Sequence, residues 1–128
     1  MIDFSKNATF NLKKIDNSDI NKNAAAILID GEILVGVYKT IRDQVVFTNK
    51  RIITVDIKGI TGKQQELFTM PYANIQYFGI QTVGLFELIP DAELALFFNN
   101  GMRADFEFRG KSDIIEIGKM ISEYTLRK

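Results

Sequence analysis

The chain has 128 residues, with 16 basic and 16 acidic side chains and neither cysteine nor histidine. This length fits one domain, and the missing residue types exclude disulfides and remove the commonest general base and transition-metal ligand. Zero net charge disfavours a nucleic-acid partner, because basic residues supply much of the affinity of such modules. Residues 1–6 lack the apolar run of a signal peptide, and no apolar stretch approaches the ~20 residues that span a bilayer. We therefore expect a cytoplasmic domain that needs no cofactor and no metal.

The N-terminal segment contains one short helix. Residues 1–17 are polar, with many Asn and Lys, and predict an irregular extension. Ser18 is a candidate N-cap for a helix that ends near Asp30. Apolar side chains recur at helical spacing in this helix, namely Ile20, Ala24, Ile27 and Leu28. The sequence thus divides into an extension with a short helix, residues 1–29, and a domain at residues 30–128.

From Glu32 onward the apolar period changes to two, which is typical of strands. The pattern predicts five strands separated by turn residues, at 32–38, 44–48, 51–56, 65–70 and 74–83. Between the third and fourth strands, two glycines and two lysines predict a solvated loop.

A hairpin is the clearest local prediction. Residues 93–99 and 102–108 alternate apolar and polar side chains, and they flank Asn100-Gly101. Asn-Gly between two strands is typical of a tight hairpin turn, because both residues tolerate positive φ. We therefore expect residues 94–99 and 102–108 to pair in antiparallel fashion.

The last element is predicted to be a helix at about 112–126. Ser112 is the expected N-cap, and an apolar stripe follows at Ile114, Ile117, Ile121 and Tyr124. A single amphipathic helix must pack on something, and the open end of a strongly bent sheet can receive it. The predicted fold is mainly β with a C-terminal α-helix: seven antiparallel strands in a bent sheet or partly open barrel, capped by that helix. Strands that come in hairpins exclude a parallel α/β design.

Seven antiparallel strands followed by one helix resemble the pleckstrin-homology (PH) arrangement. Several strings within residues 30–126 are similar to those of bacterial PH proteins, at 39–43, 46–53, 59–63 and 71–72. This resemblance implies no agreed ligand and a tendency to assemble into homo-oligomeric rings. The family often reads Phe-Asp-Leu-Asp-Ala-Glu-Leu after the fifth strand, whereas this chain is longer there by Ile89-Pro90.

A basic site is the first candidate for function. In eukaryotic PH domains, basic residues around the first two strands hold phosphoinositide headgroups, and Lys39 and Arg42 occupy such positions here. Phosphate oxygens favour convergent cationic donors. Lys50 and Arg51 lie in the next turn, which should be at the opposite end of the strands. Ordinary surface charge is the alternative, since Asp43 neutralises part of the loop.

An apolar loop is the second candidate. Large apolar side chains follow the fifth strand, at Leu85, Phe86, Leu88 and Ile89. An exposed apolar patch normally marks a contact surface, so these residues form a predicted oligomer interface. The alternative is a loop that folds back on its own core.

The remaining patterns predict structure more than chemistry. The carboxylate pairs Asp91/Glu93 and Asp105/Glu107 lack a histidine base or activated nucleophile, so no catalytic residue is expected. Residues 59–63 lack the full spacing of a phosphate-binding loop and predict a turn. Most aromatic side chains should lie in the core, with Phe86 and Phe97 as exceptions.

The predicted function is a non-catalytic module that associates with itself, as a homo-oligomer and possible ring, with an unknown ligand or other protein partner. The alternative is a peripheral membrane or anionic-ligand binder that uses Lys39 and Arg42. We do not expect a strong membrane contact.

Overall fold

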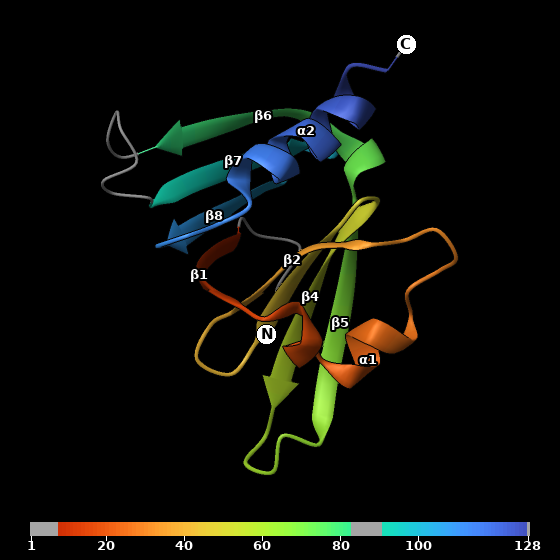
Figure 1. The fold of residues 1–128 in the computed structure, drawn as a ribbon, viewed down its shortest axis with the longest axis vertical. Coiled ribbons are helices and arrows are strands. Elements are labelled where there is room, and N and C mark those ends of the chain that lie inside the picture. Colours follow the sequence, from red (N-terminus) through yellow and green to blue (C-terminus); the bar gives the residue numbers. More distant parts are fainter. Residues whose placement is uncertain (1–7, 83–90, 128) are drawn as a thin grey trace.

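The computed structural model describes residues 8–82 and 91–127 (Figure 1). Its elements follow the chain as β1 (Ala8–Ile15), η1 (Asn17–Asp19), α1 (Lys22–Ala26), β2 (Leu34–Lys39), β3 (Gln44–Thr48), β4 (Arg51–Lys58), β5 (Gln64–Pro71), η2 (Tyr72–Asn74), β6 (Ile75–Thr82), β7 (Ala92–Phe98), β8 (Arg103–Arg109) and α2 (Ile114–Thr125). Within these residues no helix is long and apolar enough to cross a membrane.

The described strands form one eight-stranded sheet in the order β5-β4-β3-β2-β1-β8-β7-β6. Figure 1 shows that the sheet curls, so that β6, β7 and β8 form a layer across the direction of β4 and β5. Strands β2 to β8 are the seven that the sequence predicts. The register Ala92↔Phe108 to Phe97↔Arg103 confirms the antiparallel hairpin around Asn100-Gly101.

Strand β1 corrects the prediction of an irregular segment at residues 1–17. It lies between β2 and β8, antiparallel to β2 and parallel to β8. Its apolar signal is short, because Phe10 and Leu12 alternate with Asn11 and Lys13 in a polar region. Phe10 stacks on Phe106 with ring centroids 5.0 Å apart, and Leu12 is buried. The strand is thus fixed by partners that are far away in the sequence.

The first helix also differs from its prediction. Asn21, and not Ser18, is the N-cap of α1, and its side chain accepts hydrogen bonds from the amides of Asn23 and Ala24. Ser18 lies in η1 instead, where Asp16 accepts from its amide. The helix ends at Ala26, before the predicted Asp30. It is short, and only one of its side chains, Ala24, is buried, against the outer face of the layer that contains β2, β3 and β4.

Helix α2 confirms the predicted packing against the sheet. Ile114, Ile117 and Ile121 are buried in the core, and Figure 1 shows the helix lying across the β6–β8 layer. The N-cap is Asp113 and not the predicted Ser112. The reason is tertiary, because the Asp113 amide donates to the hydroxyl of Tyr38 over 2.7 Å, and that hydroxyl donates back to Asp113 Oδ2 over 2.7 Å.

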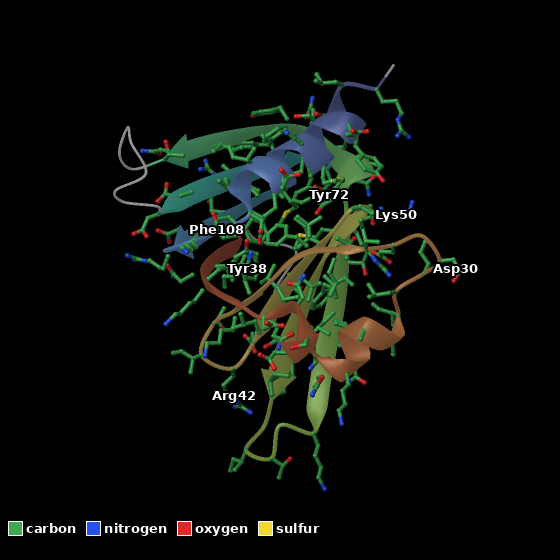
Figure 2. All side chains as sticks on the ribbon, viewed as in Figure 1. Asp30, Tyr38, Arg42, Lys50, Tyr72 and Phe108 are labelled. Atoms are coloured by element: carbon green, nitrogen blue, oxygen red, sulfur yellow. The ribbon has the colours of Figure 1, made fainter. Side chains whose placement is uncertain are left out.

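Aromatic rings fill the interior of the curled sheet. Tyr38 and Phe108 meet edge to face with centroids 4.9 Å apart, and Figure 2 shows both near the middle of the molecule. Phe47 contacts both of them. Tyr72 is also buried, and its hydroxyl donates to the Thr48 carbonyl over 2.7 Å. Burial raises the pKa of both tyrosines above its usual range, so these hydroxyls remain protonated.

Candidate functional site

The predicted basic pair lies at one rim of the curled sheet. Lys39 is the last residue of β2, and Arg42 lies in the turn that leads to β3. Both border an open depression of about 970 Å3. The guanidinium of Arg42 donates to the Gly59 carbonyl over 2.6 Å, so it links this turn to the β4–β5 loop. The structure therefore brings the pair to one surface but gives Arg42 a structural partner.

Two further cations at this rim were missed by sequence reasoning. Lys13 of β1 stands in register with Lys39 of β2 on one side and with Arg109 of β8 on the other. All three side chains are exposed, and all border the same depression. We call Lys13, Lys39 and Arg109 the basic row. Lys13 was missed because its segment was predicted to be irregular, and Arg109 because it follows the predicted end of the strand.

Within residues 8–82 and 91–127, no ion pair joins Lys13, Lys39 or Arg109 to an acidic side chain. The ion pairs that the described residues do form with one another are Lys14–Asp113, Arg51–Glu32, Lys58–Glu66 and Arg103–Asp105. Two carboxylates near the row are engaged by backbone amides: Asp43 accepts from Ile57 over 2.8 Å, and Asp91 accepts from Gly110 over 2.6 Å. These amide bonds hold the two carboxylates in place without an ion pair to the row, and Asp43 and Asp56 also line the depression.

Lys50 and Arg51 belong to the opposite end of the strands, as predicted. Figure 2 shows Lys50 and Arg42 on opposite sides of the molecule. Arg51 binds both oxygens of the Glu32 carboxylate, with Nε–Oε2 at 2.8 Å and Nη2–Oε1 at 2.9 Å. Burial tends to raise the pKa of Glu32, but hydrogen bonds from Arg51, Thr48 and the Ile29 amide outweigh it, and the pKa lies below its usual range. Arg51 is thus a structural cation.

The other predicted patterns take structural roles. Gly59 and Gly62 have φ of 75° and 68°, which confirms a turn at residues 59–63. Asp105 accepts two hydrogen bonds from Arg103 Nε, in the manner of a surface pair. Phe97 lies on the face opposite the core and stacks on Tyr77 with centroids 4.4 Å apart.

The sheet edges form the second candidate surface. β5 and β6 are the two end strands of the sheet. Beside β6, apolar side chains stand partly or largely in solvent: Tyr77 is 57% exposed, Ile80 40%, Ile115 64% and Leu126 75%. The predicted interface residues Leu85, Phe86, Leu88 and Ile89 follow β6 in the sequence and lie outside the described residues.

Comparison with known proteins shows which family the chain resembles. A model described as the bacterial PH domain matches residues 3–125. Two uncharacterized proteins of Bacillus subtilis (strain 168) are similar: YjqA is 33% identical over 114 residues, covering 88% of this chain and 90% of YjqA. YozO is 34% identical over 110 residues, covering 86% of this chain and 93% of YozO.

Solved structures agree with this match. A protein with a pleckstrin-homology domain from Shewanella loihica PV-4 has 32% identity and a TM-score of 0.68, covering 91% of this chain and 98% of that one. A pleckstrin homology domain from Shewanella amazonensis SB2B has 34% identity and a TM-score of 0.57, covering 90% and 92%. A bacterial protein from Exiguobacterium sibiricum 255-15 shares the fold at 20% identity, with a TM-score of 0.58, covering 91% and 61%.

Proposed function

Because the chain belongs to the bacterial PH domain family, we propose that it is a non-catalytic interaction module that associates with further copies of itself through the edges of its sheet. The open edges of β5 and β6 carry this proposal. Each is eight residues long, and each has one strand neighbour among the described elements. Such edges leave backbone N–H and C=O groups that a strand of another copy can satisfy.

Strand β6 lacks the usual protection of an edge. Natural edge strands are commonly blunted by charged side chains or proline. β5 carries Glu66 and Pro71, whereas β6 carries neither a charged residue nor a proline. A long, uncharged edge strand pairs readily with a strand of another molecule. The composition of β6 therefore supports a role in association.

Apolar area next to β6 adds to this argument. Ile80 of β6 lies beside α2, where Ile115 and the C-cap residue Leu126 are also exposed, whereas Tyr77 is exposed on the opposite face of β6, against Phe97. Their burial would contribute about 25 cal/mol per Å2, before the cost of association is subtracted. The predicted contribution of Leu85, Phe86, Leu88 and Ile89 belongs to the same proposal.

Pairing of β6 with β5 of the next copy is a contact between two different surfaces. Such a head-to-tail contact gives a closed ring when the rotation between copies closes, and an open filament when it does not. Zero net charge lowers the electrostatic barrier to association. Because the resemblance to bacterial PH proteins implies rings, we expect a ring of copies and not a filament.

Light scattering on the purified chain tests this proposal. We expect a mass that is a multiple of the 14.5 kDa chain, and we expect the double variant Ile80→Lys/Gln81→Lys to lower it because it charges the β6 edge. Ile29→Lys is the matched control, since Ile29 is 60% exposed and precedes β2, away from β6.

Phe86→Asp tests the predicted loop separately. A wild-type chain that stays monomeric at high micromolar concentration would refute the proposal.

A further inference from the structure

The basic row crosses the middle of the sheet. Lys39, Lys13 and Arg109 lie on β2, β1 and β8, which are three consecutive strands and are flanked by other strands on both sides. Neighbouring strands lie about 4.8 Å apart, so the three positions span roughly 10 Å. The row is distant in sheet order from the β5 and β6 edges, and its role is therefore independent of self-association.

Strand alternation places the three side chains on one face. Their neighbours Leu12, Tyr38 and Phe108 are buried in the core inside the curled sheet. Successive side chains on a strand point to opposite faces. Lys13, Lys39 and Arg109 therefore leave the sheet together on its outer face, at the rim of the depression.

Three adjacent cations have an energetic cost. Like charges directly opposite one another on neighbouring strands destabilise a sheet. Across the described chain none of the three forms an ion pair, and Glu107, two residues before Arg109 on the same face, forms none with them. The fold therefore maintains three adjacent cations without an ion pair among the described residues, and the two carboxylates of the depression, Asp43 and Asp56, leave a surplus of positive side chains there.

We propose that the basic row binds an anion that carries several phosphate groups in a line. Phosphate oxygens accept charge-assisted hydrogen bonds from Lys and Arg, and an arginine can bind two oxygens at once. A ligand with successive phosphates can meet all three cations, whereas one orthophosphate cannot span roughly 10 Å. Free oligophosphates and clustered anionic lipid headgroups share this chemistry. Arg42 lies beside the row but is held by the Gly59 carbonyl, so it contributes less.

Titration calorimetry with sodium tripolyphosphate at low salt is the first test. We expect binding by the wild-type chain, weaker binding of orthophosphate, and weakening by salt. Lys13→Gln and Arg109→Gln should each lower the affinity about fivefold, the effect of removing one cation near a phosphate-rich surface. Lys119→Gln removes an exposed cation of α2 and is the matched control, with a change of less than about twofold. Arg42→Gln should also have little effect.

Vesicle co-sedimentation is the second test and separates the two sources of phosphate. Vesicles of phosphatidylcholine with roughly 30% phosphatidylglycerol present clustered phosphates with excess negative charge, and pure phosphatidylcholine is the control. Binding in either assay that depends on Lys13 and Arg109 supports the row, and the assay that gives it identifies the source. The proposal is overturned if neither probe binds, if both row variants bind like wild type, or if Lys119→Gln weakens binding equally. Circular dichroism checks that each variant is folded.

Discussion

Lys13 and Lys14 are consecutive residues of β1, yet their side chains meet opposite electrostatic surroundings. Lys14 reaches the N-terminus of α2, where its Nζ binds Asp113 Oδ1 at 2.7 Å and Oδ2 at 2.9 Å. Lys13 points to the other face, where its register neighbours are Lys39 and Arg109. The two neighbours therefore belong to two regions: one in which Lys14 is paired with a carboxylate, and one in which Lys13 stands between two other cations.

The ion pair around Asp113 helps to hold the fold together. Arg51 and Glu32 form a similar ion pair at the other end of the strands. Asp113 joins β1, β2 and α2 through Lys14 and Tyr38. Arg51 joins β4 to Glu32 and to the Ile27 carbonyl after α1. These charges are fixed by several partners each. The basic row makes no such bonds in the described chain, so its charges are available to a ligand.

The largest expected effect comes from breaking the Arg51–Glu32 pair. The Glu32 carboxylate is fully covered, so Arg51→Gln would leave a buried charge without its main partner and destabilise the fold by about 3 kcal/mol. Chemical denaturation at neutral pH measures this change. Glu32→Gln combined with Arg51→Gln should cost less than Arg51→Gln alone, because no charge remains buried. An equal or larger loss in the double variant would contradict this account.

The same pair predicts that the folded state loses stability at acid pH. The pKa of Glu32 is lower in the folded chain than its usual value of 4.5, so the folded state favours the charged form. Its contribution to stability is therefore full above about pH 4.5 and is lost as the pH falls through the lowered folded value. Denaturation between about pH 6 and pH 3 should show a smaller pH-dependent loss in Glu32→Gln than in wild type.

A smaller effect is expected at Gly36, which gives Asp113 room to reach Tyr38. A Cβ at Gly36 would collide with Asp113 Oδ2. Gly36→Ala should therefore displace the carboxylate and cost about 2 kcal/mol in the free energy of unfolding. Gly79→Ala in β6 is the matched control, because a Cβ there meets nothing within 4 Å. Strand propensity alone favours Ala over Gly, so a loss in Gly36→Ala no larger than that in Gly79→Ala would show that the clash with Asp113 is not responsible.

The sequence predicts local structure here better than it predicts which charges meet. Strands β2 to β8 and helix α2 follow from alternation, from the Asn100-Gly101 turn and from a helical stripe, all of which are local signals. Strand β1 has only Phe10 and Leu12 as buried markers, and its neighbours come from β2 and from β8 almost a hundred residues later. Lys39 was identified from its place beside the first turn. Its neighbours Lys13 and Arg109 could be found only once the parallel β1–β8 pairing was known.

The smallest expected effect distinguishes the two lysines directly. Lys14→Gln removes an ion pair whose lysine is 39% exposed, so it should lower stability by only about 0.5–1 kcal/mol. Lys13→Gln relieves repulsion from Lys39 and Arg109, so it should leave stability unchanged or raise it by a few tenths of a kcal/mol. Thermal unfolding of both variants at low salt measures the difference, and high salt should shrink it because these charges are accessible to ions. A loss of stability in Lys13→Gln equal to that in Lys14→Gln would mean that Lys13 also has a structural partner. If Lys13→Gln also weakens tripolyphosphate binding, then the charge of Lys13 serves the proposed ligand and not the stability of the fold.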